Sequence, residues 1–246
     1  DEKELVSLED YVGRMKKDQK EIYYSLGNSK EAIDLNPHLE IFKAKGLEVL
    51  FLYDPVDEFV VSSIRKHKDF DFKSVDGVDL KELDKLEDVE KNEEPKEKFS
   101  KEDDKAFGKL LLKMKEILGD RVTEVHESKR LKGSPSCLIN PDDTMSSTMQ
   151  KILKMSNQGM AMPPQKRLME INKDHKLIKN LMNVFKKNES DQFIADTTEQ
   201  LYESALLLEG NLEDPHKLVN RLNKMLTDAS ELYVASPSPS KGGEQK

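Results

Sequence analysis

A run of charged residues divides this sequence into two parts and limits what either part can fold into. From Lys81 to Lys105, 18 of the 25 residues are charged. Such a run has too few apolar side chains to join a core, so we interpret it as a solvated connector with a domain boundary near residue 95. The 246 residues are enough for two ordinary domains. We therefore predict one domain at 1–95, which includes the acidic linker, a second at 96–234, and a disordered Ser/Pro/Gly-rich tail at 235–246.

The first part alternates helix and strand signals. Ser7, with an acidic residue three positions later, predicts a helix start. An aromatic strand is expected over 20–26, a helix over 28–46 that ends at Gly46, an apolar strand over 47–53, and a helix over 54–67 with Pro55 in its first turn. This order predicts a small three-layer α/β subdomain with parallel strands.

The second part has the pattern of an α+β domain. Ser100 is the expected cap of a helix whose apolar stripe ends before Gly119. Three short strands are predicted at 121–128, 134–140 and 166–172, followed by helices at 173–187, 190–210 and 214–234. We expect a small sheet that carries these helices.

The last two helices carry more apolar surface than one hairpin can bury. In the final helix the apolar residues step by four and three positions, which is the spacing of a helix-packing seam; they are Leu218, Leu222, Met225, Ala229 and Leu232. The preceding helix places Ile194, Leu201, Ala205 and Leu208 on one side. Two interpretations stay open on this pattern: a second copy completes a four-helix bundle, or earlier helices of the same domain cover the surface.

Methionine is concentrated in one segment, residues 142–164, which holds five of the ten in the chain. With Asp142 or Asp143 as cap, one helical stripe contains Met145, Met149, Ile152 and Leu153. A methionine stripe suits either a core or a surface that adapts to several partners. The Gly/Met/Pro loop that follows at 159–164 favours a partly exposed, adaptable helix.

Composition excludes several classes of function. A net charge of −8 argues against nucleic-acid binding, and no apolar run approaches the roughly 20 residues of a membrane span. One cysteine, Cys137, allows no intrachain disulfide and fits a reducing cytoplasm, where we interpret it as a small buried hydrophobe. The N-terminus has neither Met nor a signal-peptide pattern, so we expect a fragment of a longer protein.

No catalytic signature is found. The five histidines have no metal-ligand spacing, so no metal site is predicted: His38, His67, His126, His175 and His216. His175 is expected to form a structural hydrogen bond at a helix start. The segment 27–30, GNSK, is better explained as a helix cap after a strand than as a phosphate loop.

Several longer motifs resemble the C-terminal half of the heat shock protein 90 chaperones of bacteria. They are SLEDYVGRMKKDQKEIYY, PHLEIFKAKGLEVLFLYDPVDEF, SKRLKGSPSCLI, LMEINKDHKLI and ALLLEGNLEDPHKLVNRLNKML, which follow the family's order over residues 7–226. The acidic linker and the tail lack family character. The resemblance implies that residues 1–95 are the last α/β subdomain of a middle domain and that the rest is a C-terminal dimerisation domain.

The resemblance also implies functional residues. The final helix pair would form an intersubunit four-helix bundle, with Ile194, Leu201, Ala205, Leu208, Leu218, Leu222, Met225 and Ala229 in the homodimer interface. Non-native client proteins would contact Met145, Met149, Ile152 and Leu153 on the amphipathic helix, and Glu58, Phe59 and Ser62 on the middle domain. The family often has Trp and Asn where this chain has Phe59 and Ser62.

The same resemblance implies what this stretch does not do. The ATP-binding domain, with its Mg²⁺, and the arginine that reaches the γ-phosphate would precede residue 1, so we expect no ATP hydrolysis and no cofactor here. The chain ends in GGEQK instead of an acidic MEEVD-type peptide, so no docking of tetratricopeptide co-chaperones is expected. The leading hypothesis is part of a cytoplasmic, homodimeric chaperone that binds unfolded clients. The alternative is a purely structural dimerisation or connector module without a client surface.

Overall fold

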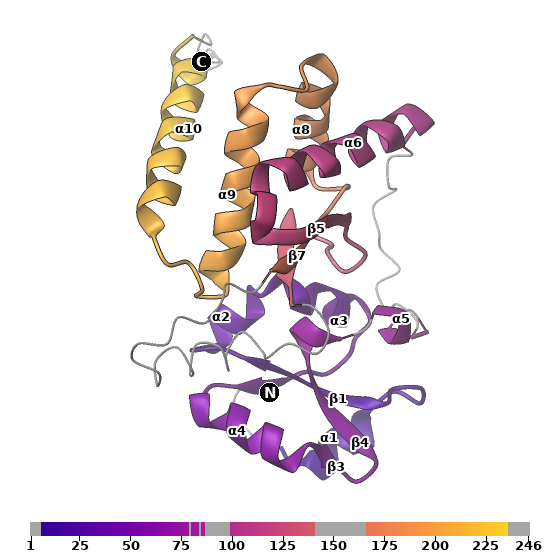
Figure 1. Cartoon of the computed structure of the whole chain (residues 1–246). Coiled ribbons are helices and arrows are strands. Elements are labelled where there is room, and N and C mark those ends of the chain that lie inside the picture. The colour runs from indigo at the N-terminus through magenta and orange to yellow at the C-terminus, as the bar shows by residue number, and fades with distance from the viewer. Residues whose placement is uncertain (1–5, 79, 84, 87–98, 141–165, 236–246) are drawn as a thin grey trace, which may run out of the picture.

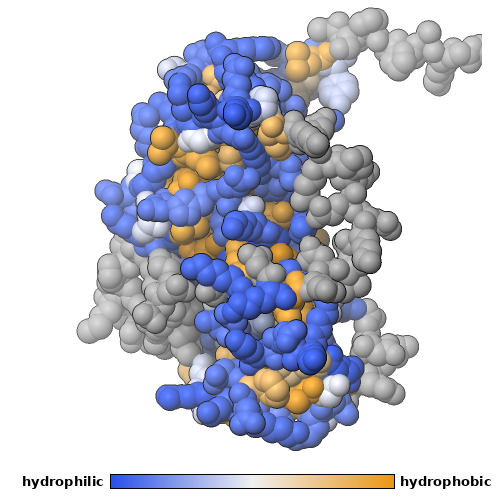
Figure 2. All heavy atoms as spheres, turned by 90° about the vertical axis from the view of Figure 1, so that its right-hand side faces the viewer, coloured by the Kyte–Doolittle hydropathy of each residue, from blue (hydrophilic) through white to orange (hydrophobic). Residues whose placement is uncertain are grey.

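The protein is a mixed α/β structure with two small mixed sheets, each of which carries helices (Figure 1). A computed structural model describes residues 6–78, 80–83, 85–86, 99–140 and 166–235. The predicted boundary near residue 95 lies outside these residues, so the division into domains stays a prediction. Figure 2 shows one side of the molecule, where hydrophilic residues cover most of the surface and apolar residues gather in separate patches.

The first sheet has the strand order β2-β1-β4-β3. Its strands are β1 (Glu21–Leu26), β2 (Leu50–Leu52), β3 (Lys66–His67) and β4 (Phe70–Ser74). The predicted parallel pairing is confirmed, since β1 runs parallel to β2 with Tyr24 opposite Leu50. Strand β4 is also parallel to β1, while β3 is antiparallel to β4. The sequence analysis missed β3 and β4, a hairpin that turns at Lys68 with a positive φ of 54°.

Proline divides the helix that was predicted over 28–46. The structure has α2 (Lys30–Asp34), a 3₁₀ turn η1 (Pro37–Leu39) and α3 (Glu40–Ala44) instead, so the prediction of one helix is wrong. Pro37 disfavours the helical conformation at Asn36, which is extended and whose side chain accepts from the His38 N–H at 3.0 Å. A new turn therefore starts at this proline.

The other helices of the first part follow their predicted starts. They are α1 (Leu8–Arg14) and α4 (Pro55–Ile64), with a 3₁₀ turn η2 (Val75–Gly77) and the short α5 (Leu80–Leu83) after the sheet. Ser7 caps α1 and Asp54 caps α4, each through a reciprocal capping box with the acidic residue three positions on. Figure 1 shows α2 and α3 on the side of the sheet nearer the second sheet, and α4 on the other side.

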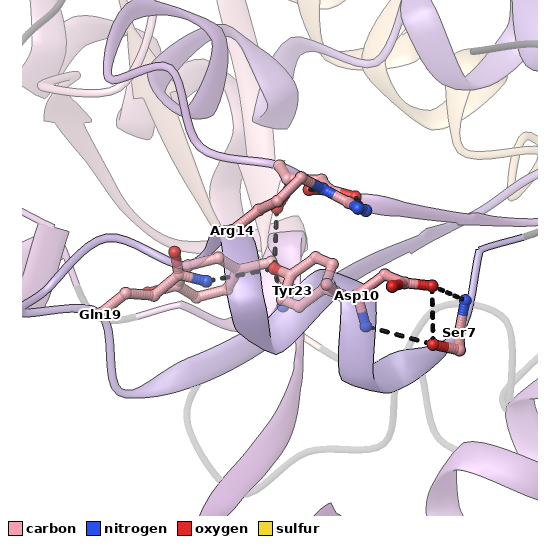
Figure 3. A network of polar contacts seen from close by, with 7 residues as sticks. Ser7, Asp10, Arg14, Gln19 and Tyr23 are labelled. Atoms are coloured by element: carbon pink, nitrogen blue, oxygen red, sulfur yellow. Dashed lines mark hydrogen bonds and ion pairs between the residues drawn. The ribbon is translucent and has the colours of Figure 1, made fainter.

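Helix α1 is attached to this sheet through one buried hydroxyl (Figure 3). The Tyr11 hydroxyl donates to the Glu48 carbonyl at 2.8 Å and accepts from the Tyr23 N–H at 3.0 Å and the Gln19 amide at 3.1 Å. Arg14, in the last turn of α1, pairs with the Glu48 carboxylate at 2.7 Å. The helix is thus tied both to β1 and to the segment that leads into β2.

The second sheet has the predicted three strands, in the order β5-β7-β6. Strands β5 (Val122–Glu127), β6 (Ser136–Ile139) and β7 (Arg167–Ile171) place β7 in the centre, parallel to β5 and antiparallel to β6. The predicted helices are confirmed as α6 (Lys101–Leu118), α8 (Lys176–Lys187), α9 (Gln192–Leu208) and α10 (Pro215–Ala235). Ser100 caps α6, which ends at Gly119 in the 3₁₀ turn η3 (Gly119–Arg121).

One hydrophobic core joins this sheet to α6, α8 and α9. The α6 stripe contributes Phe107, Leu110, Met114 and Leu118, and they pack with residues of the sheet and of the two later helices. Helix α10 contributes nothing to this cluster among the described residues. It lies at the edge of the molecule, beside α9 (Figure 1).

Candidate functional site

The groups that sequence analysis weighed for chemistry have structural roles. The His175 ring accepts from the Leu177 N–H at 3.1 Å as the cap of α8, as predicted. Ser29 caps α2 in the same way, which confirms that GNSK is a helix cap. Burial raises the pKa of the Cys137 thiol, so this side chain is the small buried hydrophobe expected. Across the described residues no cluster of His, Cys, Asp and Glu could hold a metal ion.

The described helices also include none long and apolar enough to cross a membrane. Among the described helices, α10 and α4 each carry four or more large apolar side chains that are exposed to solvent.

Helix α10 is amphipathic but almost unburied. Among its described side chains only Leu218 is buried. Large apolar residues remain exposed along its length: Val219, Leu222, Leu226, Leu232, Tyr233 and Val234. A 21-residue helix of this kind has apolar surface for which its own protomer provides no cover in the described structure.

Two ion pairs hold α10 on α9 and determine which side remains open. Arg221 donates to the largely buried Glu203 at 2.9 Å, and Lys224 pairs with Asp196 at 2.9 Å. Burial acts to raise the pKa of the Asp196 carboxylate, but the hydrogen bonds from Gln192 and Lys224 and the charges of Lys224 and Arg221 together lower it. In the described structure these two pairs hold α10 along the flank that faces α9.

The residues expected in the dimer interface fall into two groups. Ile194, Leu201 and Ala205 of α9 lie in the core of their own protomer, and Leu218 is buried as well. The other four keep accessible surface: Leu208, Leu222, Met225 and Ala229. None of these placements tests a contact with a second copy, so that contact stays a prediction.

The exposed flank of α10 combines two predicted interface residues, Leu222 and Ala229, with three that the sequence analysis did not single out. Val219, Leu222, Leu226, Ala229 and Tyr233 step by three, four, three and four positions, so they share one face of the helix. We call these five residues the α10 flank. This second seam shares Leu222 and Ala229 with the predicted one and could have been read from the same spacing. Only the placement of α9 distinguishes the two seams, since it covers Leu218.

Helix α4 is turned with its apolar face outward. Val56, Phe59, Val60 and Ile64 are all between 44% and 54% exposed. The opposite face buries Val61 and the carboxylate-bearing Glu58, which is only 3% exposed. The four outward side chains form what we call the α4 face. An ordinary surface helix buries its apolar side chains and exposes its charged ones, whereas α4 exposes apolar side chains and buries Glu58.

The predicted client-contact residues are only partly described. Phe59 and Ser62 reach the surface of α4, whereas Glu58 lies inside, near Tyr24. Burial raises the pKa of the Tyr24 hydroxyl, and the charge of Glu58 raises it further. Met145, Met149, Ile152 and Leu153 lie outside the described residues, so their expected surface remains a prediction.

The two parts of the chain meet through a short loop between β5 and β6. The Glu40 carboxylate, at the start of α3, accepts from the N–H groups of Gly133 at 2.8 Å and Ser134 at 2.9 Å, and also from that of Lys132. Beside it, Arg130 pairs with Glu170 at 3.2 Å, and both are buried. We call the hydrogen bonds from Lys132, Gly133 and Ser134 to the Glu40 carboxylate the clasp. It fixes the helices of the first sheet against the second sheet.

Comparison with known proteins gives a consistent result along the whole chain. The family model described as "Hsp90 protein" matches residues 1–245. "Chaperone protein HtpG" of Oleidesulfovibrio alaskensis is 45% identical over 234 residues, covering 95% of this chain and 36% of that protein. The protein of the same name from Nitratidesulfovibrio vulgaris is 37% identical, covering 94% of this chain and 36% of its own length.

A third relative, "Chaperone protein HtpG" of Treponema denticola, is also 37% identical, over 92% of this chain and 34% of its own length. The chain thus spans about a third of the length of the curated relatives it matches. The match covers both sheets, the clasp between them and the exposed helices α4 and α10, and on this ground the chain belongs to the heat shock protein 90 family.

Proposed function

We propose that this chain is the part of a chaperone that holds two copies together and offers apolar surface to non-native proteins. In this proposal the first unit is a three-layer α/β subdomain, and α9 and α10 pair with those of a second copy in a four-helix bundle. The compartment is the cytoplasm. ATP binding and hydrolysis belong to the part of the relatives that this chain does not match, so no nucleotide or Mg²⁺ is assigned to these residues.

The observation that carries the proposal is the uncovered flank of α10. Each large apolar side chain removed from water contributes about 1.5–3 kcal/mol, so leaving several exposed on one helix has a considerable free-energy cost. A second copy related by a two-fold axis would cover the flank with the same flank. Stable pairs typically bury about 1,200–2,000 Å², which two such helix pairs can supply.

Sedimentation equilibrium tests the dimer directly. We expect Leu226→Glu to give monomers at concentrations where the unchanged protein is a dimer, because a carboxylate would be buried opposite another apolar flank. Leu226 is 59% exposed in the protomer, so its replacement leaves the fold intact. Asn220→Glu, on the opposite exposed face of α10, is the matched control and should remain dimeric. A dimeric Leu226→Glu protein would refute this interface.

The second half of the proposal assigns client contact to the α4 face. Its side chains are large, apolar and already exposed, so a non-native chain can cover them without unfolding the helix. The methionine stripe of Met145, Met149, Ile152 and Leu153 is proposed as the companion surface, because flexible thioether side chains adapt to different partners.

Binding of an unfolded model protein tests the α4 face. We expect Phe59→Ser together with Val60→Ser to weaken binding severalfold while the melting temperature changes little, since both residues are about half exposed. Leu112→Ser, which removes an exposed apolar side chain of α6 away from α4, is the control and should leave client binding unchanged. A large fall in stability, or unchanged client binding, would show that this face has another role.

The purely structural connector remains the second candidate, and the clasp at Glu40 is the observation that favours it. Hydrophobic-dye fluorescence separates the two. A client-binding surface gives dye binding that falls with the Phe59 and Val60 substitutions, whereas a connector gives little dye binding in any variant.

A further inference from the structure

A cavity of about 270 Å³ lies between the first sheet and the second part of the chain. Its floor is formed by Ser25, Leu26 and the Gly27–Asn28 turn at the end of β1, and by Ser74 and Asp76 at the end of β4. These are the carboxyl ends of two neighbouring parallel strands. This volume is close to the lower end of small-molecule pockets, roughly 300 Å³, so a ligand would be small.

The strand order makes this the expected place for a ligand. After β1 the chain crosses through α2, η1 and α3 to β2 on one side, and then passes through α4 and β3 to β4 on the other side of β1. The order therefore reverses at β1. In open sheets with parallel strands, a crevice forms outside the carboxyl ends at such a switch point, and ligands bind there.

The second part of the chain closes this crevice. Cys137 of β6 and the end of α9, from Ala205 to Gly210, form the opposite wall. Leu35, Leu207 and Leu208 line the cavity and are each more than half exposed, so its mouth is apolar. A molecule held here touches both parts of the chain at once.

The charges in the cavity determine which ligands fit. Asp76 accepts from the Ser74 hydroxyl and forms no ion pair with the other described residues. Glu209, the other acid of the wall, is already paired with Arg167. His38 is buried and is neutral at pH 7, because burial and the charge of Arg130 lower its pKa to about 4. No Lys or Arg is among the described residues that line the cavity, so an anion finds no charged partner there.

We propose that this cavity binds a small organic cation with an apolar body, whose charged group pairs with Asp76 and whose apolar end lies among Leu35, Leu207 and Leu208. The ligand would bridge the two parts of the chain. The proposal goes beyond the chaperone role and does not depend on dimerisation or on client binding.

Titration calorimetry with three matched probes tests it. The probes are 4-phenylbutylamine, which is cationic at pH 7, the neutral 4-phenylbutanol and the anionic 4-phenylbutyrate. We expect the amine to bind with one site per chain and at least fivefold more tightly than the alcohol, with the acid weakest. Asp76→Asn, which keeps the shape and removes the charge, should abolish the preference for the amine. Asp71→Asn, an exposed acid of β4, the strand that leads into the turn with Asp76, should leave it unchanged.

Two results would overturn the proposal: an amine that does not bind the unchanged protein, or one that binds the Asp76→Asn protein equally well. If circular dichroism shows that the Asp76→Asn protein is unfolded, the Ala32→Phe variant tests the site instead. Ala32 is exposed and lines the cavity, so a larger side chain blocks the cavity without entering the core. Amine binding should then fall at least tenfold, and unchanged binding would refute the site.

Discussion

At the scale of single residues, His38 lies where the first and second parts of the chain meet, and its titration makes the free energy of unfolding depend on pH. Its ring is buried, and its Nδ1 lies 3.4 Å from the Arg130 guanidinium. Burial first, and then the charge of Arg130, lower its pKa from 6.5 to about 4, while the carboxylate of Asp76 acts in the opposite direction. Arg167 lowers the pKa a little further.

This pKa predicts a loss of stability in mild acid. Between pH 6.5 and 4 the unfolded chain binds a proton at His38 that the folded chain does not, so stability falls as the pH falls. From pH 7.5 to 4.5 we expect His38 alone to lower the free energy of unfolding by about 2–3 kcal/mol. Urea titrations at both pH values, with the unchanged protein and His38→Gln, measure this. The variant should lose less stability than the unchanged protein, and an equal loss in both would contradict the assignment.

Local residue roles were predictable, whereas roles that join distant segments were not. Ser7, Ser100 and His175 act within a few residues of themselves, so their capping roles could be inferred from the sequence. Glu40 bonds to a loop more than 90 residues away. Its place at the start of a helix would suggest only a favourable charge near the helix dipole, and no local pattern indicates the distant partner.

At the scale of elements, α4 and α10 show where periodicity stops being informative. Periodicity identifies an apolar face but does not say whether the protein covers it. In α4 the apolar face points outward and Glu58 points inward. In α10 the seam chosen from the sequence is divided, because Leu218 faces α9 while Leu222 is exposed. Tertiary placement, which the pattern does not contain, decides both cases.

Two glycines at different elements should respond oppositely to alanine. At Gly27, between β1 and α2, an added Cβ would lie 2.6 Å from Cγ1 of the buried Ile33. We expect Gly27→Ala to destabilise the fold by about 1–3 kcal/mol, since a packed side chain must move. At Gly108, inside α6, an added Cβ meets nothing within 4 Å, so Gly108→Ala should stabilise by roughly 0.5–1 kcal/mol. Chemical denaturation of both variants checks the pair, and a shift of the same sign in both would contradict this account.

At the scale of the whole molecule, the contact between the two parts is polar and buried rather than broadly apolar. Two separate hydrophobic clusters, one around each sheet, do not share residues. Between them lie the Glu40 clasp, the buried Arg130–Glu170 pair and His38. Polar contacts of this kind are directional, so they fix one relative orientation of the parts, and that orientation shapes the cavity beside Asp76.

The clasp should therefore control how firmly the parts stay together. Glu40→Gln replaces an acceptor-only carboxylate by an amide with a single acceptor oxygen, so at least one of the N–H groups of Lys132, Gly133 and Ser134 loses its partner. We expect hydrogen exchange of these three amides to accelerate at least tenfold, because a charge-assisted hydrogen bond contributes about 1.5–3 kcal/mol. Amides in the interior of α6, far from the clasp, should exchange at their original rate.

Glu31→Gln in α2 is the control, since Glu31 is exposed and belongs to the same crossover, while the loop amides donate to Glu40. Local acceleration in Glu40→Gln alone means that the clasp opens independently of either core. Equal acceleration throughout the chain would instead mean that the two parts unfold as one unit. The clasp would then not open separately from unfolding of the whole chain.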